Sequence, residues 1–458
     1  MRSVLVVGAG NFGAATALHL AKEGGCRVTV VDSEVLPNPR SASHDVNKIV
    51  RDDYPDKLYM RMLHRAMPQW RNHSLYKQWY HEVGMLRADN TDFGENSIAA
   101  YKSFGIRNES RMLPVSEVRQ RWNGAFATTN LDGLSHILYN PNVGYAEADK
   151  ALNDVIKAAF DAGAEFLLGR VDRVIFGPGN RCVGIRLDDG EVHMADQVLL
   201  CTGARTGAIL ARSAPGNKDM HVGDRVIATG AVSFWAKLHG AQRDRFANVP
   251  VMKNCLPQVK GESMSMLSNG TIKFNCDLCF TNYVTDPATG EKMSVVPSER
   301  VLQVWTRSKF IKFFEGRARK TLDGLYGKEV ENVHVEAYRM CWDASTPTHD
   351  FLISPHPHSE NLYVATGGSF HGWKFLPVIG EYIAAMMDGT LSQEYADRWA
   401  WDKTGGDGHS ANPTYQVIGD LQEWIATEDL SVIELYEPEE PVTVGDLGMG
   451  TKKPAGSV

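Results

Sequence analysis

The chain has 458 residues, 43% of them hydrophobic, and this size permits more than one hydrophobic core, so we expect two domains. The formal net charge of −7 is small and spread along the sequence, which gives no support for nucleic acid or an anionic membrane surface as partners. No apolar run reaches roughly 18 residues, and neither a charged leader nor a peroxisomal Ser-Lys-Leu ending is seen, so we expect a cytoplasmic protein. We also expect a monomer.

The first 32 residues have the pattern of a dinucleotide-binding unit. An apolar run, Val4 to Val7, leads into the sequence Gly8-Ala9-Gly10-Asn11-Phe12-Gly13. A second apolar run, Val28 to Val31, ends at Asp32. This order predicts a buried strand, a glycine turn, a helix and a second strand that ends in an acidic residue.

The glycines and the acid each have a physical role in such a unit. Gly8 permits the tight turn, Gly10 lets the backbone approach a pyrophosphate, and Gly13 lets the helix pack against the strand. The helix N-terminus directs free N–H groups at the phosphates, and Asp32 can accept hydrogen bonds from the adenosine ribose. The fingerprint alone does not separate a nicotinamide enzyme from a flavin enzyme.

The segments that follow predict helices first and strands later. The stretch 41–142 is expected to be a largely helical region, with one helix beginning near Tyr59, and 146–162 has the spacing of an amphipathic helix. Strands are expected at 165–171, on both sides of a turn at 188–190, at 196–204, over much of 230–327, and between small residues from 336 to 380.

The seven cysteines are an odd number scattered over a large chain, which does not indicate a disulfide framework. Cys276 and Cys279 form a single C-x-x-C pair, which lacks the second pair of a structural zinc site. We interpret this pair as core packing rather than as a metal or redox site, and we expect no metal.

Four segments carry a resemblance to a known family. They are Ser41–Arg51, Glu336–Pro347, Asp350–Ile353 and Leu362–Phe375. In combination they resemble the D-amino-acid oxidase superfamily, and within it monomeric sarcosine oxidase, the fungal fructosyl amino acid oxidases (amadoriases) and saccharopine oxidase-like enzymes. The resemblance extends to about Trp424.

The resemblance implies an α/β fold, α+β overall, in which a Rossmann-like FAD-binding domain of the glutathione-reductase type joins a discontinuous antiparallel-sheet substrate domain. The FAD-binding domain is expected to consist of residues 1–85, 143–215 and 330–395. The substrate domain is expected to consist of residues 86–142 and 216–329, and the remainder, 396–458, is expected to form a C-terminal wrap and a loose tail.

The resemblance also implies that FAD is the cofactor and that Cys341 attaches it through a thioether to the 8-methyl group. A thiolate is a strong nucleophile, which suits attack on an electron-poor flavin carbon. An isolated cysteine in a buried strand would instead be inert. The other residues expected to bind the cofactor are Gly8, Gly10, Asn11, Phe12, Gly13, Asp32, Ser43, Val171, Phe370, Gly372 and Lys374.

Two lysines match positions that the family uses in catalysis. Lys273 matches the lysine that lies against the flavin and is credited with activating oxygen, because a fixed positive charge stabilises superoxide as it forms. Lys48 matches a basic position on the opposite face of the flavin, where it would keep the substrate amine neutral. His44 and His371 either line this site or are hydrogen-bonded structural histidines.

Two further positions match the pair that holds the substrate carboxylate. They are Arg51 and Lys374, whose charge-assisted hydrogen bonds would orient the substrate. Amadoriases in addition grip the sugar with a glutamate and with an arginine after a Trp-x-Trp sequence. This chain has Asp277 near the first position and Asp402 at the second, and the reversed charge argues against a fructosyl substrate.

The sequence therefore predicts a two-domain FAD oxidase that takes two electrons from the C–N bond of a secondary amine and reduces O2 to hydrogen peroxide. The expected substrate is an N-alkyl or cyclic amino acid, of the saccharopine, pipecolate or sarcosine type or an N-methylated biosynthetic intermediate. The alternatives are a fructosyl amino acid oxidase, a flavin dehydrogenase with another acceptor, and a flavin-binding scaffold without turnover.

Overall fold

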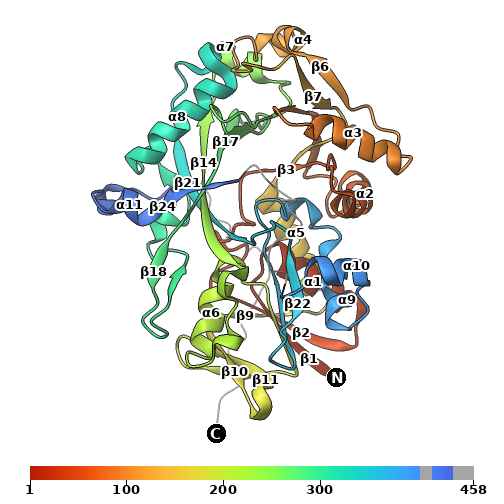
Figure 1. Cartoon of the computed structure of the whole chain (residues 1–458), viewed down its shortest axis with the longest axis vertical. Coiled ribbons are helices and arrows are strands. Elements are labelled where there is room, and N and C mark those ends of the chain that lie inside the picture. Colours follow the sequence, from red (N-terminus) through yellow and green to blue (C-terminus); the bar gives the residue numbers. More distant parts are fainter. Residues whose placement is uncertain (403–414, 437–458) are drawn as a thin grey trace.

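The computed structural model describes residues 1–402 and 415–436, and its architecture is built on two large β-sheets (Figure 1). The smaller sheet lies in the lower part of Figure 1 and contains the N-terminal strand, whereas the larger one extends through the upper part. Much of the predicted C-terminal wrap and tail, residues 403–414 and 437–458, lies outside the described residues. No helix of the described residues is long and apolar enough to cross a membrane.

The smaller sheet has six strands, and all neighbouring pairs are parallel except the pair at one edge. Its strand order is β22 (Leu352–Pro355), β23 (Leu362–Thr366), β13 (Gln197–Leu200), β1 (Arg2–Val7), β2 (Cys26–Asp32) and β9 (Glu165–Leu168). Strands buried on both faces read as continuous apolar runs, which is why the sequence predicted β1 and β2. Both predictions are confirmed.

Helices cover this sheet. Helix α1 (Asn11–Glu23) begins directly after the glycine turn and ends at Gly24, which has a φ of +73°. It packs against α5 (Ala148–Asp161) and α9 (Ile379–Met387), and a Cβ on Gly380 would lie 2.2 Å from the carbonyl oxygen of Ala15. Glycine at this position therefore lets α1 and α9 approach closely.

The larger sheet has ten strands and is mostly antiparallel. In order it contains β20 (Thr306–Arg307), β21 (Ala337–Ser345), β14 (Ile227–Lys237), β17 (Thr271–Thr281), β16 (Gly261–Ser263), β15 (Val251–Asn254), β5 (Met85–Ala88), β7 (His136–Asn140) and β6 (Arg111–Pro114), with β24 (Val417–Asp420) beside β17. The range 330–395, predicted for the FAD-binding domain, supplies β22 and β23 to the smaller sheet and β21 to the larger one.

The remaining strands form small sheets. These are β10 (Val171–Phe176), β11 (Cys182–Leu187) and β12 (Val192–Met194); β3 (Lys48–Val50), β8 (Gly144–Ala146) and β4 (Tyr80–Glu82); and the hairpin of β18 (Tyr283–Thr285) and β19 (Lys292–Ser294). The predicted turn at 188–190 joins β11 to β12.

The other helices are distributed over the lower and the upper part of the molecule (Figure 1). They are α2 (Lys57–Asn72), α3 (Phe93–Ser103), α4 (Val115–Gln120), α6 (Thr206–Ser213), α7 (Gly240–Phe246), α8 (Lys312–Tyr326), α10 (Gln393–Arg398) and α11 (Leu421–Ile425). The stretch 41–142 contains three of them but also several strands. The expectation that strands dominate 230–327 missed α8, whose buried Phe314, Ala318 and Leu322 recur every four residues.

The loop after β2 is fastened to β21 by one arginine. Arg339 on β21 is 1% exposed. Its guanidinium donates hydrogen bonds to the carbonyl oxygens of Pro39 at 3.1 Å and Ser41 at 2.7 Å, and also to that of His44. This loop continues into the segment that carries Lys48, so Arg339 sets its position relative to the larger sheet.

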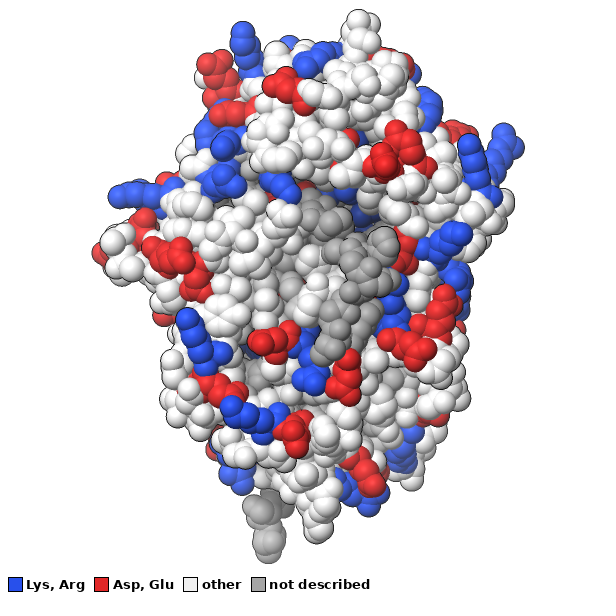
Figure 2. Space-filling view, viewed as in Figure 1, with Lys and Arg blue, Asp and Glu red and all other residues white. Residues whose placement is uncertain are grey.

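The surface carries charges of both signs. On the face shown in Figure 2, the Lys and Arg side chains are interspersed with Asp and Glu side chains. This mixture accords with the small net charge of the sequence.

Candidate active site and cofactor cavity

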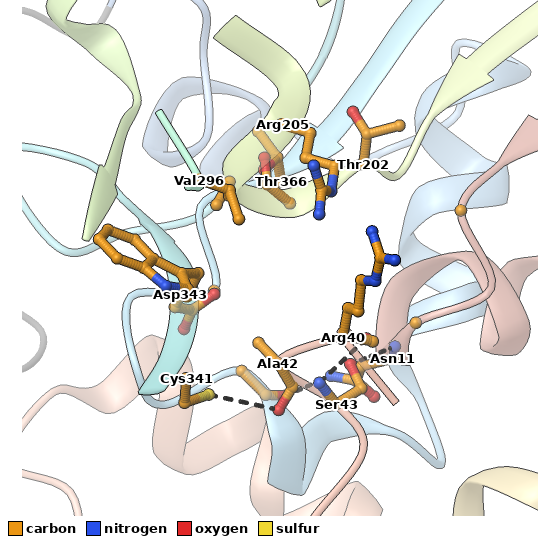
Figure 3. A pocket seen from close by; sticks show the side chains of 18 of the residues that line it. Asn11, Arg40, Ala42, Ser43, Thr202, Arg205, Val296, Cys341, Asp343 and Thr366 are labelled. Carbon is orange, nitrogen blue, oxygen red and sulfur yellow. Dashed lines mark hydrogen bonds between the residues drawn. The ribbon is translucent and has the colours of Figure 1, made fainter. Parts of the chain in front are cut away.

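A cavity of about 460 Å³ lies where the two large sheets meet, within the range of roughly 300–1,000 Å³ that is usual for small-molecule sites. One part, which we call the nucleotide end, is lined by the glycine turn, Asp32 and Val171. The other, the lysine-rich end, is lined by Lys48, Lys253 and Lys374. Figure 3 shows side chains of the nucleotide end, among them Asn11 and Ser43, together with that of Cys341.

The glycine turn has the close backbone packing that a dinucleotide site requires. Gly8 has a φ of +97°, and a Cβ there would lie 2.5 Å from the carbonyl oxygen of Cys201. A Cβ on Gly13 would lie 1.8 Å from the carbonyl oxygen of Gly8, and one on Gly10 would lie 3.1 Å from the Ser43 hydroxyl. A side chain at any of the three glycines would displace the turn or fill the space in front of the N-terminus of α1. These residues therefore fit a bound pyrophosphate.

The polar residues around the glycine turn hold it in place. Asp32 accepts hydrogen bonds from the backbone N–H of Ala9 at 2.8 Å and from the Asn38 side chain at 2.6 Å, while burial raises its pKa. Asn11 binds Ser43 through its backbone N–H at 2.8 Å and Gly372 through its side chain at 2.7 Å. Asp32, Asn11 and Ser43 all line the cavity, as does Phe12.

Four arginines at the nucleotide end were not predicted from the sequence. They are Arg40, Arg170, Arg205 and Arg212, and they all line the cavity. Figure 3 shows the side chains of Arg40 and Arg205 reaching into the same space. Burial, together with Arg170 and Arg40, lowers the pKa of Arg205 to about 10. A bound anion would relieve the repulsion between these guanidinium groups, so the arginines fit the diphosphate of FAD.

Cys341 lies on β21 between the two ends of the cavity. Its side chain lines the cavity, and its Sγ lies 3.9 Å from the carbonyl oxygen of Ala42 (Figure 3). Phe370 and Gly372 line the same region, and the backbone N–H of Phe370 donates to Asp343 at 2.7 Å. The structure therefore brings together Cys341 and the predicted contact residues of the segment 362–375.

The two predicted catalytic lysines share one carboxylate. Asp45 Oδ2 lies 2.9 Å from Lys48 Nζ and 2.6 Å from Lys273 Nζ, which also donates to the carbonyl oxygen of Asn47 at 3.0 Å. Burial works to raise the pKa of Asp45, but the two ammonium groups hold it well below its ordinary value. For Lys273, burial outweighs the attraction of Asp45, and its pKa is lowered.

Only one of these lysines reaches the cavity wall among the described residues. Lys48 and Asp45 line the cavity, whereas Lys273 is 1% exposed and lies behind Asp45. The two lysines and Asp45 together therefore act on the cavity as a buried group with one net positive charge. That Lys273 activates oxygen stays a prediction.

Arg51 and Lys374, the predicted carboxylate clamp, meet at Tyr54. The Arg51 guanidinium lies 4.5 Å from the Tyr54 ring centroid, and Lys374 Nζ lies 3.1 Å from the Tyr54 hydroxyl. Arg51 pairs with Asp53 at 3.5 Å, but Lys374 has no ion pair within the described part of the chain. Burial and the charge of Arg51 together lower the pKa of Lys374 well below its ordinary value. An incoming carboxylate would supply the missing negative charge.

Asp277 is fully buried on β17 and does not line the cavity itself. Its Oδ2 lies 2.5 Å from Lys253 Nζ, which also lies 2.8 Å from Glu262 Oε2. Lys253 and Glu262 line the cavity, as does Tyr415, and none of these three residues was predicted from the sequence. For Lys253 the available signal was a charged residue directly after the apolar Val251 and Met252.

The two histidines have different positions. His371 lines the cavity, and its Nε2 lies 2.8 Å from the carbonyl oxygen of His349. His44 is not among the described residues at the cavity wall, and burial lowers its pKa to about 4. Asp402, expected near a sugar site, instead pairs with Arg225 at 3.0 Å and is also absent from the described lining. The described residues hold no cluster suited to a metal ion.

Comparison with known proteins assigns the chain to a family. The sequence model of the FAD dependent oxidoreductase family, DAO, matches residues 3–386. The chain belongs to the DAO family. Its members bind FAD, so the fold class, the cofactor and the oxidoreductase activity predicted from the sequence are confirmed, whereas covalent attachment remains a prediction.

Individual relatives support the same assignment of this DAO-family chain. It is 28% identical over 430 residues to L-saccharopine oxidase of Schizosaccharomyces pombe, which covers 87% of this chain and 93% of that protein. N-methyl-L-tryptophan oxidase of Salmonella agona is 23% identical over 384 residues, and the match covers 83% of this chain and 93% of that protein. Among solved structures, fructosyl peptide oxidase from E. terrenum has a TM-score of 0.78 at 26% identity and covers 94% of this chain and 98% of its own.

Proposed function

We propose that this enzyme oxidises the C–N bond of a secondary amine carried by an amino acid, with O2 as the electron acceptor and an imine and hydrogen peroxide as products. One observation carries the proposal: the ammonium of Lys374, buried beside Arg51 in the cavity, lacks a carboxylate partner among the described residues. An amino acid substrate supplies that carboxylate, and relatives named for saccharopine and N-methyl-L-tryptophan oxidation support the substrate class.

The residues of the chain orient and prepare the substrate. Arg51 and Lys374 would bind the carboxylate, and this fixes the direction in which the α carbon points. The net positive charge of Lys48, Asp45 and Lys273 favours the neutral form of an amine beside them, and a neutral amine is the form that can be oxidised. Bound FAD supplies the acceptor for the two electrons.

A fructosyl amino acid is the second candidate substrate, because several similar solved structures are fructosyl peptide oxidases or amadoriases. Two features of this chain weigh against it. Asp277 is occupied by Lys253, and Asp402 pairs with Arg225.

Peroxide release by the purified holoenzyme tests the proposal. The panel contains L-saccharopine, L-pipecolate, sarcosine, N-methyl-L-tryptophan and fructosyl-valine, each assayed with and without catalase. We expect turnover of at least one secondary amino acid, together with bleaching of the flavin absorbance under anaerobic conditions. Bleaching without peroxide in air would identify a dehydrogenase, and an unbleached flavin with every compound would contradict amine oxidation.

We further propose that Cys341 holds FAD covalently, which its place at the cavity wall supports. Replacing Cys341 by serine is expected to leave FAD bound in the native protein but extractable by trichloroacetic acid. Absorbance at 450 nm in the pellet and the supernatant measures this. Cys201→Ser, at another cavity-lining cysteine, is the matched control and should keep its flavin in the pellet. Flavin retained by denatured Cys341→Ser would refute the attachment.

A further inference from the structure

A row of polar side chains crosses the larger sheet at the lysine-rich end of the cavity. The strand register pairs Lys253 with Glu262, Glu262 with Asn275, and Asn275 with Ser233. Residues that are directly opposite on neighbouring strands share one face of a sheet. All four line the cavity, so this row, from β15 through β16 and β17 to β14, forms part of its wall.

Hydrogen bonds join the row into one network. Ser233 Oγ donates to Asn275 Oδ1 at 2.5 Å, and Asn275 Nδ2 donates to Glu262 Oε1 at 2.6 Å. Lys253 Nζ donates to Glu262 Oε2 at 2.8 Å and to Asp277 Oδ2 at 2.5 Å. Each member is thereby held in one orientation and presents a fixed pattern of charge to the cavity.

The network brings both signs of charge to the same wall. Lys253 and Glu262 are 4% and 6% exposed. Burial works against the charge on each, but the pKa of Lys253 is raised by Asp277 and Glu262, and that of Glu262 is lowered by Lys253. An ammonium and a carboxylate therefore face the cavity together.

Stability alone does not account for these charges. A buried ion pair contributes little more to folding than apolar residues of the same volume, because desolvation offsets the attraction. The members of the wall already bond to one another, but an alkyl or indole group on the substrate would add no hydrogen bond or charge contact to them. The wall instead matches a ligand group that itself carries both charges.

The boundary of this region is aromatic. Tyr415 stacks on Phe370 with ring centroids 4.3 Å apart, and Lys253 Nζ lies 5.3 Å from the Tyr415 centroid. Both rings line the cavity, as does Cys341. Tyr415 lies just before β24, and Phe370 lies in the segment after β23. The polar row is thus enclosed beside the cofactor contacts rather than open to bulk water, which strengthens its charge-assisted hydrogen bonds.

We propose that Lys253, Glu262 and Asn275 form a second substrate subsite, and that this subsite binds a zwitterionic α-amino acid group at the far end of the substrate. Lys253 would bind its carboxylate, while Glu262 would accept hydrogen bonds from its ammonium. The proposal rests on the proposed function, since Arg51 and Lys374 would hold the carboxylate beside the oxidised amine. The substrate class is then a pair of amino acids joined through one secondary amine.

A set of matched substrates tests the subsite with the holoenzyme. All carry the same secondary amine and neighbouring carboxylate, and they differ at the far end: an α-amino acid group, a carboxylate alone, an ammonium alone, or an alkyl chain of equal length. We expect kcat/KM to fall roughly 10- to 100-fold when either charge is removed and further when both are, with most of the change in KM. Equal or better turnover of the alkyl or a fructosyl compound would overturn the subsite.

Variants of Glu262 and Lys253 test which residue binds which charge at the far end of the substrate. Glu262→Gln keeps the side-chain shape, and we expect it to raise KM for the compounds with a distal ammonium by a larger factor than KM for the alkyl compound. Lys253→Met should do the same for the distal carboxylate, with Lys253→Arg retaining part of the preference. Glu331→Gln, at an exposed site, is the control. An equal loss for all four compounds would contradict the assignment.

A binding measurement separates this inference from the proposed function. The analogue replaces the secondary amine of the zwitterionic compound by a thioether, and its dissociation constant is read from the flavin absorbance. We expect Glu262→Gln to weaken its binding at least about tenfold and Glu331→Gln to leave it unchanged. If no secondary amine is oxidised, the proposed function fails. If amines are oxidised but distal charge is not discriminated, only the subsite fails.

Discussion

Replacing Lys374 by methionine is expected to raise the KM for the amino acid substrate about 100-fold, because a charge-assisted hydrogen bond in a buried site is lost and the substrate carboxylate is left unpaired. The effect on kcat should be smaller, since Arg51 remains to orient the carboxylate. Steady-state peroxide release over a range of substrate concentrations measures both constants. Lys320→Met, on the exposed side of α8, is the control.

The substrate offers a second control for the clamp. The primary amide of the same substrate has no carboxylate, so Lys374→Met should change its KM far less than that of the acid. An equal change for acid and amide would show that Lys374 does not bind the carboxylate.

The pH dependence of the same KM follows from the lowered pKa of Lys374. The free enzyme should lose this proton well below the ordinary lysine value of about 10.4, and only the ammonium attracts a carboxylate. The wild-type KM should therefore rise with pH below the range in which an ordinary lysine titrates. Lys374→Arg, which keeps its charge, should lack this rise. A wild-type KM that stays constant up to pH 10 would contradict the lowered pKa.

Replacing Asp45 by asparagine is expected to lower the free energy of unfolding by roughly 3–5 kcal/mol, the usual cost of breaking a buried ion pair by removing one partner. Lys48 and Lys273 would then face one another without the carboxylate that both bind. Urea unfolding of the holoenzyme, followed by circular dichroism, measures the difference. Asp161→Asn, which removes the exposed partner of Lys157, should cost under about 1 kcal/mol.

The contribution of Asp45 to stability has a defined pH range. Its pKa is lower in the folded protein than the ordinary value of about 3.9, so its stabilisation is complete above that value and is lost as the pH falls below it. The difference between the wild type and Asp45→Asn should be constant from pH 6 to pH 8 and shrink below about pH 4. A difference that persists unchanged at pH 3 would show that its charge is not responsible.

The N-terminal unit could be predicted from the sequence because all its determinants are local. The apolar run, the three glycines and Asp32 lie within one continuous segment, and each acts on residues close to it. The clustering of Lys48 and Arg51 with Cys341 and Lys374 needed a different source, since the first two residues lie far from the last two in the sequence. Their grouping came from the family resemblance, and the cavity lining agrees with it.

The polar row of the larger sheet could not be predicted, because strand register places its members together. Lys253, Glu262 and Asn275 belong to three strands, and a shift of one residue in any of them would turn its side chain to the other face. Nothing within each short strand fixes this register. The arginines at the nucleotide end were missed for a similar reason, as they come from separate loops and helices and meet only in the folded protein.

The fastening of the loop after β2 by Arg339 limits how such enzymes can be recombined. The loop carries Ser43 and Asp45 and leads into β3 with Lys48, while β21 carries Cys341. Arg339 joins the loop to β21 across 295 residues of sequence. A chimaera that receives either segment from a relative would keep Cys341 in register with Lys48 and Asp45 only if both segments came from the same parent. The loop and β21 are therefore best exchanged as one unit, even though the chain order separates them.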